Sequence, residues 1–560
     1  MADAAAGRRR AGPGQSGETF APIRAVTAGS DRDGSQPSGI RAALSPTPLA
    51  RGYAATAYQY IIAAFAERSG TERNAEGDLP LPGVQGLPPA TLQLARTFSA
   101  LTWAEVPEPV RRETERLLLD TLGCLLAGAD TEIGPIARNV GLALGGGIPV
   151  FVAGGADLGL LGAIYANARL ANALDLDETF PVGAHFGIGA VASALGLAEA
   201  QKQSGAAFLT AILTGYELGA RLASQIGPVI EITDGRVTGF PVIWGVAAPV
   251  VLAAAGAAAR LLAQDPDTFA QTLGVAGANT PIPAGAHWAA AVDLPNAKYC
   301  DAGWCAVTGA GAALAVEAGT TGFPSILDGP SGLARVSGAV SPGVAHLTEG
   351  LGERWLIADI TYKPWPSCRF THPVLTALGA ILANERPAVD GITAIVVETG
   401  PLNGSARFTL ATPRTFASRQ FSFPHLVAMQ LLAVPPGPAW SDPRWVEDPV
   451  ATALRAKVSF VSHPRGEDFV HSLTRNQMRT LPGGIQLHLA DGRVLRAESD
   501  TAQGDPWDPG TLLSDEMLAA KVRGLVPGPA EPLIEAVEGL SRAPSVGPLI
   551  AALKAAGERQ

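Results

Sequence analysis

The sequence predicts a mainly α-helical protein in which a smaller α+β segment is inserted between two helical stretches. Apolar residues recur at helical spacing from residue 89 to about residue 355, and Gly or Pro ends each segment. From residue 356 to about residue 505, β-branched and alternating patterns replace this spacing. The helical pattern returns in residues 506–560, so we expect these last helices to pack back on the first stretch.

Residues 1–88 are predicted to be a disordered or weakly structured tail, because Gly, Pro, Ser and Arg dominate them. One apolar island, "YAATAYQYIIAAFA", is long enough for a short helix. The N-terminus "MADAAAGRRR" has three arginines, but no apolar run follows them directly, and acidic residues weaken the pattern of a transit peptide. We therefore expect an untargeted tail.

In the first helical stretch, the uncharged run "GFPVIWGVAAPVVLAAAGAAA" is long enough to suggest a transmembrane helix. Two prolines interrupt it, and Ala and Gly outnumber Leu and Ile, a composition that suits close packing inside a helical core. We expect a buried helix here and no contact with a membrane.

Three runs predict the strands of the α+β segment: "ITAIVVETG", "KVSFVSH" and "GGIQLHLADGRVLRAESD". The last run contains "ADGR", which is typical of a hairpin turn. In the helical stretch that follows, Ser514 is the expected N-cap of a helix that begins at Asp515.

Composition indicates a globular protein and argues against several partners. Of the 560 residues 47% are hydrophobic and 16% are charged, a balance that allows a large core. A net charge of −10 without a basic run argues against nucleic acid as the main partner. Four scattered cysteines without a CxxC pair predict neither a disulfide framework nor a zinc site, so we expect a cytoplasmic protein.

The stretch "NALDLDETFPVGAHFG" concentrates polar chemistry in an otherwise small and apolar region. If the preceding helix continues through it, Asp175 and Thr179 share one face and Asp177 points elsewhere. Pro181 then ends this helix. The next helix places His185 near its N-terminus, where free backbone N–H groups favour an anion.

Two other interpretations of this stretch remain open. Its acidic residues could be solvated residues at a helix end, with His185 as an ordinary loop histidine. A DxD sequence with a histidine can also bind a divalent cation. No second histidine follows at a short interval, so we expect no metal.

The stretch resembles the MmgE/PrpD family, which includes 2-methylcitrate dehydratase, cis-aconitate decarboxylase and an iminodisuccinate epimerase. Four further stretches resemble family motifs in the same order: "LLLDTLGCLLAG", "AKYCDAGWCAVTGAGAALAVEAGTTGFPSILDG", "YKPWPSCRFTHPVLTAL" and "GDPWDPGTLLSDEMLAAKV". The resemblance implies a helical domain of residues 89–355 and 506–560 and an inserted α+β lid domain of residues 356–505. It also implies a homodimer that needs no cofactor.

Carried over residue by residue, the resemblance implies a catalytic set of Asp175, Thr179, His185, Lys298 and Lys363. The two lysines would bind substrate carboxylates and stabilise negative charge that develops on the neighbouring carbon. His185 is the expected proton carrier, because an imidazole gains and loses a proton near neutral pH.

Five further positions are expected to bind substrate: Trp244, Asp301, Arg369, His372 and His425. Trp244 and Asp301 stand where the family has histidines, and His425 stands where it has a tyrosine. The tryptophan removes acid–base capacity and adds apolar bulk, so we expect a changed substrate. Arg369 and His372 could equally hold the start of the lid domain, and His425 could belong to the interior.

The leading hypothesis is a cofactor-independent lyase that acts on a small anionic di- or tricarboxylic acid, with dehydration favoured over decarboxylation. An isomerase or epimerase of a polycarboxylate would use the same proton abstraction and return the proton. A family member that binds an acid without catalysis is the third hypothesis, and it is suggested by the histidine that Trp244 replaces.

Overall fold

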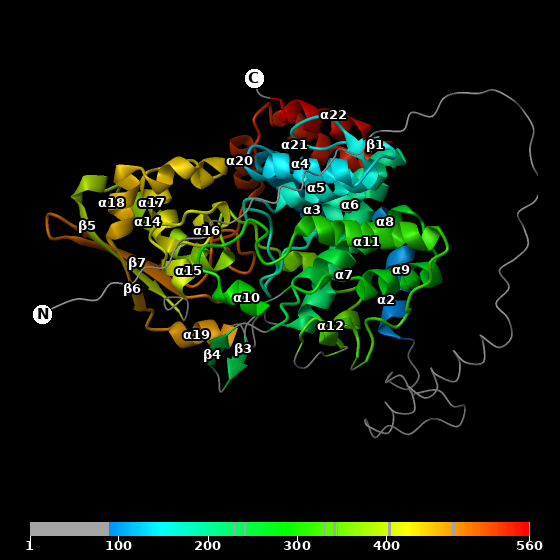
Figure 1. The fold of residues 1–560 in the computed structure, drawn as a ribbon, viewed down its shortest axis with the longest axis horizontal. Coiled ribbons are helices and arrows are strands. Elements are labelled where there is room, and N and C mark those ends of the chain that lie inside the picture. Colours follow the sequence, from blue (N-terminus) through cyan, green and yellow to red (C-terminus); the bar gives the residue numbers. More distant parts are fainter. Residues whose placement is uncertain are drawn as a thin grey trace, which may run out of the picture. The chain divides into compact units, whose positions relative to one another are not determined.

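Helices dominate the described part of the chain in a computed structural model, which confirms the mainly α-helical fold (Figure 1). The structure describes residues 89–558, apart from residues 228–230, 234–235, 240–241, 284, 330, 340–342, 344, 401–404 and 473–477. The predicted tail, residues 1–88, lies outside the described residues. The described residues belong to one compact unit, and the domain limits at residues 355 and 505 stay predictions.

The helices of the first stretch are α2 (Ala90–Ala100), α3 (Glu108–Ala129), α4 (Ile133–Ala143), α5 (Leu160–Ala171), α6 (Gly187–Ala200), α7 (Gly205–Ile226), α8 (Ala247–Leu261), α9 (Pro266–Ala278), α10 (Gly285–Ala290), α11 (Ala302–Glu317), α12 (Leu333–Val336) and α13 (Ala345–Thr348). Two short antiparallel strand pairs interrupt them: β1 (Pro149–Val150) with β2 (Leu158–Gly159), and β3 (Glu231–Thr233) with β4 (Arg236–Gly239). The sequence patterns did not predict these two pairs.

Helix α8 lies at the centre of the first hydrophobic core and contacts α6, α7 and α11. Nearly all of its residues are buried, which confirms a buried helix for residues 247–259 of the predicted run. The start of that run is not helical, since Gly239 belongs to β4 and Val242 is exposed. Small residues allow the close contacts: a Cβ atom on Gly309 of α11 would lie 2.3 Å from the Val251 carbonyl oxygen of α8. No helix in the described residues combines the length and the apolar character that a bilayer span requires.

The second core, formed mainly by residues 374–489, surrounds a four-stranded sheet with the order β6-β5-β7-β8. The predicted strands are β5 (Ile392–Thr399), β6 (Val458–Ser462), β7 (Gly483–Leu489) and β8 (Val494–Ser499), with "ADGR" between the last two. Strand β5 is parallel to β6 and antiparallel to β7. The helices here are α14 (His372–Asn384), α15 (Ala406–Thr409), α16 (Phe416–Arg419), α17 (Phe423–Leu431), α18 (Pro449–Ala456) and α19 (Gly466–His471).

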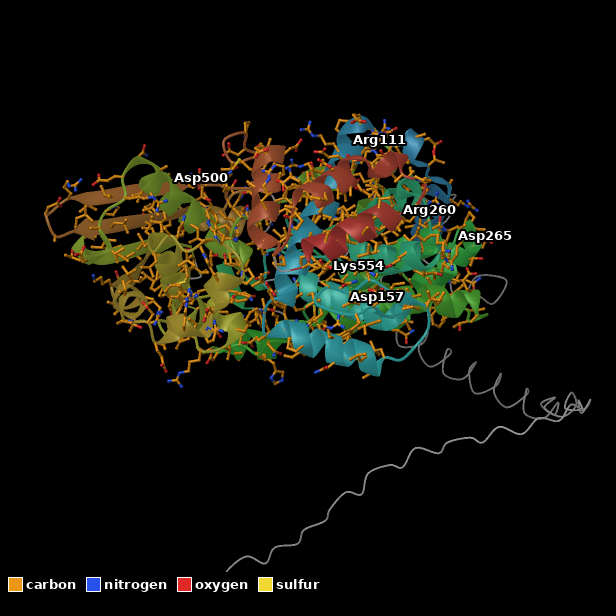
Figure 2. All side chains as sticks on the ribbon, turned by 90° about the horizontal axis from the view of Figure 1, so that it is seen from above. Arg111, Asp157, Arg260, Asp265, Asp500 and Lys554 are labelled. Carbon is orange, nitrogen blue, oxygen red and sulfur yellow. The ribbon has the colours of Figure 1, made fainter. Side chains whose placement is uncertain are left out.

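The C-terminal helices return to the first core, as the sequence predicts. They are α20 (Asp515–Leu525), α21 (Glu531–Glu538) and α22 (Gly547–Ala556). Helices α20 and α21 pack on α3 (Figure 1), and Lys554 of α22 forms an ion pair with Asp157 at 2.9 Å (Figure 2). The Ser514 side chain accepts a hydrogen bond from the Met517 N–H, which confirms the predicted N-cap.

Candidate active site

The loop that follows α5 carries the polar stretch noted in the sequence. Helix α5 ends at Ala171, so the predicted continuation of a helix through Asp175 and Thr179 is wrong. The φ angle of Asp175 is +53°, a left-handed conformation that a right-handed helix does not contain. Lys298 has a similar φ of +54°. Such backbone strain persists only where surrounding contacts hold the residue in place.

Four side chains from distant parts of the sequence, and His185 of the loop itself, bind the carbonyl groups of this loop. The bonds run from Lys298 Nζ to Asn172 O (2.7 Å), Gln420 Nε2 to Ala173 O (2.9 Å), Lys363 Nζ to Asp175 O, Lys521 Nζ to Leu176 O (2.9 Å) and His185 Nδ1 to Glu178 O (2.6 Å). A buried carbonyl group needs a donor, which a continuous helix would have supplied from its own backbone. These side chains replace the helical hydrogen bonds and fix the loop.

Three side chains converge on one carboxylate oxygen, Asp175 Oδ1. This oxygen lies 3.0 Å from Lys363 Nζ, 3.9 Å from Lys298 Nζ and 3.5 Å from His185 Nε2. Asp175 is 1% exposed and Lys363 is fully buried. The structure thus brings together four of the five residues that the family resemblance implies as catalytic.

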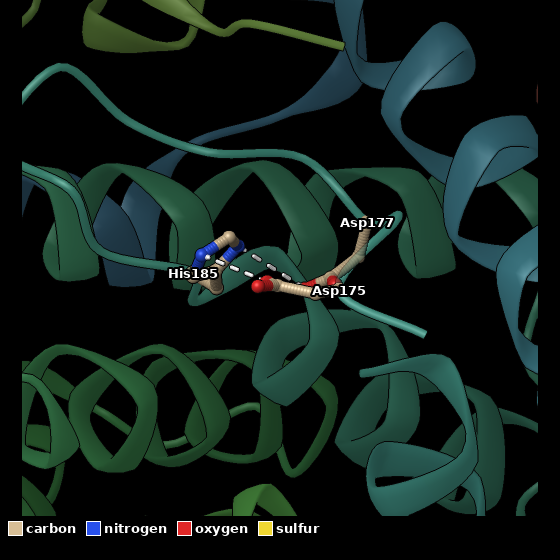
Figure 3. Close-up of side chains that lie close together, drawn as sticks. All are labelled: Asp175, Asp177 and His185. Carbon is tan, nitrogen blue, oxygen red and sulfur yellow. Dashed lines mark ion pairs between the residues drawn. The ribbon is translucent and has the colours of Figure 1, made fainter. Parts of the chain in front are cut away.

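The two ring nitrogens of His185 face two carboxylates, those of Asp175 and Asp177 (Figure 3). A carbonyl oxygen can only accept a hydrogen bond, so the contact with Glu178 O requires a hydrogen on Nδ1. In the neutral ring Nε2 is then the basic nitrogen, and it faces Asp175. Asp177 Oδ2 lies 3.4 Å from Nδ1, so the expectation that Asp177 points elsewhere is wrong, because the loop is not helical.

Neighbouring positive charges decide the protonation states of Asp175 and Asp177. Burial acts to raise the pKa of Asp175, but Lys298, Lys363 and His185 together hold it far below its ordinary value. Burial also acts to raise the pKa of Asp177, but His185, Lys363 and Lys298 together lower it below its ordinary value. Burial lowers the pKa of Lys298 to about 8, even though Asp175 and Asp177 favour its charged form. Both aspartates are therefore ionised at neutral pH.

Glu178 closes the loop against the start of α6. Its Oε1 accepts hydrogen bonds from Gly187 N at 2.6 Å and Phe186 N at 3.0 Å, at the N-terminal end of the helix. Burial and the charge of Asp177 raise the pKa of Glu178 to about 8, against these two donors. His185 directly precedes these residues, so the prediction that it lies near a helix N-terminus is confirmed.

Thr179 joins the loop to the segment that carries Lys363. Its backbone forms an antiparallel bridge with Thr361, with N–O distances of 2.9 and 3.0 Å. The Thr179 hydroxyl lies 3.4 Å from Ala184 O and 3.5 Å from Phe180 O. Thr179 is therefore adjacent to the cluster through its backbone, and its role toward a substrate stays a prediction.

An aromatic wall of Trp244, Trp288 and Tyr299 lies beside His185. The Tyr299 ring is 6.3 Å from the His185 ring between centroids, with 18° between their planes. Trp244 lies 5.0 Å from Tyr299 and 5.8 Å from Trp288. Trp244 therefore stands near the cluster and contributes an apolar surface there.

Asp301 and Arg369 have partners of their own in the structure. Asp301 accepts hydrogen bonds from Gly303 N, as the N-cap of α11, and from the Tyr165 hydroxyl. Arg369 Nη2 binds both carboxylate oxygens of Asp505, at 2.7 and 2.6 Å. This pair favours the structural interpretation of Arg369 that the sequence left open.

His372 and His425, the last two of the predicted substrate-binding residues, are both buried. His372 Nε2 lies 3.1 Å from the Ser367 hydroxyl, and burial lowers its pKa well below the ordinary value. His425 Nε2 donates to the Trp440 carbonyl oxygen at 2.7 Å, and burial lowers its pKa to about 3. The surroundings of His425 favour an interior residue over a proton carrier.

Asp175, Asp177 and His185 could supply three ligand atoms to one metal ion, because these atoms lie within 4.8 Å of one another. Two ammonium groups already face Asp175 Oδ1, and a divalent cation there would be repelled by both. The donor set therefore fits a carboxylate paired with lysines better than a metal centre.

A second possible ligand set is formed by Glu398, His463 and Glu498 on the sheet. Arg496 already pairs with both glutamates, at 3.0 and 3.5 Å. His463 Nδ1 accepts a hydrogen bond from Arg465 N, which leaves the ring hydrogen of the neutral form on Nε2, the nitrogen nearest Glu498. These contacts describe an ion-pair network.

Sequence reasoning missed three residues of the site: Gln420, Lys521 and Tyr299. Lys521 belongs to "SDEMLAAKV", a stretch noted for its resemblance, and Tyr299 directly follows Lys298. Their positions within or beside recognised motifs were the signals that could have indicated Lys521 and Tyr299. Which side chain of α20 turns inward depends on how α20 packs on α3, and residue spacing does not reveal that contact.

Two protein-family models match the chain. The MmgE/PrpD N-terminal domain matches residues 92–342, and the MmgE/PrpD C-terminal domain matches residues 365–536. A comparison with curated proteins finds no match. The two models follow one another in the expected order and together cover most of the chain, which therefore belongs to the MmgE/PrpD family.

Proposed function

We propose that the protein is a cofactor-independent lyase that removes water from a small hydroxylated di- or tricarboxylic acid. The observation that carries this proposal is the convergence of Lys298 Nζ, Lys363 Nζ and His185 Nε2 on buried Asp175. Membership of the MmgE/PrpD family supports a dehydratase-like or related reaction.

The lysines suit a reaction that places negative charge on carbon next to a carboxylate. Each ammonium group has three N–H donors. Within the described residues, Lys298 Nζ has one hydrogen bond, to Asn172 O, and Lys363 Nζ has two, both to Asp175. Donors therefore remain for a substrate carboxylate, and in a buried site each well-placed donor lowers the barrier by about 3 kcal/mol.

His185 suits the proton transfer. Nε2 receives the proton from the carbon beside the substrate carboxylate, while Nδ1 keeps its hydrogen bond to Glu178 O. The imidazolium that results is stabilised by the two aspartates that face its nitrogens. Asp175 also positions both ammonium groups, so its role is structural and electrostatic.

An isomerase or epimerase is the second candidate, and Trp244 favours it. Returning a proton to carbon requires no acid for a departing hydroxide, and an indole ring supplies none. Decarboxylation is a third outcome of the same charge arrangement. An acid-binding protein without catalysis would need the same lysines.

Incubating the purified protein with hydroxylated, unsaturated and amino di- and tricarboxylic acids in D₂O separates these candidates by NMR. We expect alkene signals, which report dehydration. Deuterium uptake with inverted configuration would instead identify an epimerase, and loss of a carboxylate a decarboxylase. If none of these acids changes, the proposal that the protein is an enzyme is contradicted.

Dialysis against EDTA tests whether a metal takes part. We expect the rate of alkene formation to remain the same after dialysis, because ammonium groups supply the positive charge. A loss of activity that added Mg²⁺ or Zn²⁺ restores would assign Asp175, Asp177 and His185 to a metal ion instead.

The proposed assembly is a homodimer, on the basis of the family resemblance. Large apolar side chains such as Phe323 and Ile282 are exposed in the single chain, at 66% and 60%, and a partner could cover such residues. Light scattering should give twice the chain mass of 57.3 kDa, and a monomeric mass at micromolar concentration would contradict the dimer.

A further inference from the structure

The Tyr299 hydroxyl is a buried polar group without a hydrogen-bond partner among the described residues. Removing a hydroxyl group from water without giving it a partner is unfavourable, and buried hydroxyls are ordinarily paired. Such an unpaired group therefore requires an explanation. Tyr299 directly follows Lys298, one of the two lysines of the cluster.

Tyr299 is the polar member of the aromatic wall beside His185. Its ring is nearly parallel to the imidazole at 6.3 Å, while Trp244 and Trp288 meet it edge-on at 5.0 and 5.5 Å. Neither indole has an exchangeable proton acidic enough for catalysis. The phenol is therefore the one proton donor in this wall.

We propose that Tyr299 donates its phenolic proton to the hydroxyl group that leaves the substrate. This inference rests on the proposed dehydratase function and supplies the acid that Trp244 lacks. Tyr299 would touch the substrate oxygen, which makes it a catalytic residue of that reaction. The leaving hydroxyl would also provide the hydrogen-bond partner that the phenol otherwise lacks.

The step balances without any further reactant. His185 Nε2 first takes the proton from the carbon beside the carboxylate, and the C–H electron pair is held as enolate-like charge beside Lys298 and Lys363. This electron pair then forms the C=C bond as the C–O bond breaks. The departing oxygen takes the Tyr299 proton and leaves as water. The proton on His185 then returns to the phenolate, directly or through water, and restores both groups.

Burial and the nearby charge of Asp175 raise the pKa of Tyr299 well above its ordinary value, so the phenol keeps its proton throughout the neutral range. It can nevertheless protonate a departing hydroxide, because water is a much weaker acid than a phenol. The other candidate acids are placed less well. His425 donates to Trp440 O, and burial keeps His372 neutral.

The test compares Tyr299→Phe with wild type in D₂O, using the hydroxy acid that the wild-type protein dehydrates. Two rates are followed by NMR: deuterium uptake into recovered substrate, which reports proton removal, and alkene formation. Tyr216→Phe is the matched control, because the Tyr216 hydroxyl is also buried without a partner in the described residues but belongs to α7.

We expect Tyr299→Phe to slow alkene formation by about 100-fold, the usual effect of losing a general acid. Deuterium uptake should persist, so that its ratio to alkene formation rises at least tenfold. Tyr216→Phe should leave both rates unchanged. The thermal midpoint of Tyr299→Phe should be no lower than that of wild type, since no hydrogen bond is lost.

Three results would overturn the inference and leave the proposed function standing. One is alkene formation by Tyr299→Phe within twofold of wild type. The others are an equal fall in both rates of Tyr299→Phe and a parallel fall in Tyr216→Phe, each of which would indicate a general structural effect. A wild-type protein that converts no acid of the panel would overturn the proposed function, and the role of Tyr299 with it.

Discussion

At the scale of single residues, Asp175 organises the site. A non-glycine residue with φ of +53° is strained, and it is held by bonds from Lys363 to both its carbonyl and its carboxylate. The same carboxylate lies near Lys298 and His185. One acid therefore sets the positions of His185, from its own loop, and of two lysines from distant parts of the sequence.

Replacing Lys363 by methionine tests the contribution of one ammonium group. We expect turnover to fall by a factor of about 100 to 1,000, because the side-chain volume is kept while a charged donor is lost. The control is Lys554→Met, which removes a half-exposed lysine that pairs with Asp157. Turnover of Lys363→Met close to that of the control would remove this lysine from the mechanism.

The pKa of Lys298, about 8, predicts an alkaline limit to activity. As pH rises through about 8, Lys298 loses its proton and positive charge, so kcat/KM should fall above this value. The free energy of unfolding changes in the opposite direction from kcat/KM. Between about 8 and the ordinary value of 10.5 the unfolded chain binds more protons, and the free energy of unfolding rises with pH.

Glu178 complicates this pH profile, because its pKa is also raised to about 8. Glu178→Gln separates the two groups, since an amide oxygen can still accept the bonds from Phe186 N and Gly187 N. If Lys298 causes the decline, it persists in Glu178→Gln. Rates of wild type that stay level from pH 7 to 10, or a decline that Glu178→Gln abolishes, would count against Lys298.

The sequence and its resemblance pointed to Asp175, His185, Lys298 and Lys363, because these residues lie in recognisable motifs. They did not reveal that Asp177 flanks the imidazole, since a helix was assumed where the chain turns. The roles of Gln420 and Lys521 could not be predicted from the sequence, for a different reason. Each acts through a contact more than 200 residues away, which no local pattern encodes.

At the scale of elements, the long patterns were predicted best. The buried helix α8, the strands β5 to β8 and the N-cap of α20 all follow from local spacing and residue type. The end of α5 at Ala171 was not predicted, because the residues after it are compatible with a helix locally. Hydrogen bonds from other side chains to their carbonyl groups stabilise a loop instead of a helix. Local helix propensity gives no information on such contacts.

The Gly504→Ala variant tests how closely the backbone at Gly504 approaches Tyr362, the residue before Lys363. Gly504 has φ of +104°, and a Cβ atom there would lie 1.8 Å from the Tyr362 carbonyl oxygen, next to Lys363. Gly492 has φ of +89° with nothing within 4 Å, so it is a matched control. We expect Gly492→Ala to cost about 1 kcal/mol of unfolding free energy.

Gly504→Ala should cost several times more than this control and should also lower turnover, because the backbone around Tyr362 must move. Urea denaturation followed by circular dichroism measures the first effect. Equal losses of stability in the two variants would show that only the φ angle matters, and that the close approach does not.

At the scale of the whole molecule, a buried ion pair connects segments that belong to different cores. Arg369, which precedes α14, pairs with Asp505 in the segment that returns to the first core. Asp505 also accepts a hydrogen bond from the Thr361 hydroxyl, near the bridge to Thr179. The connection between the two cores is therefore tied directly to the candidate site.

Asp505→Asn should lower the free energy of unfolding by about 3 to 5 kcal/mol, because it leaves the buried Arg369 guanidinium without its counter-charge. Glu385→Gln breaks the exposed pair with Arg493 and should cost less than about 1 kcal/mol. Chemical denaturation of both variants gives the comparison. A loss in Asp505→Asn as small as that in Glu385→Gln would contradict a structural role for this pair.

The most direct test of the whole proposal is the rate at which the protein exchanges the substrate hydrogen beside the carboxylate with D₂O, compared between wild type and His185→Gln. We expect exchange in wild type and a rate lower by about 100-fold or more in the variant, since proton transfer by a positioned base contributes this much. Equal rates in the two proteins would mean that His185 is not the base and that the cluster around Asp175 serves another purpose.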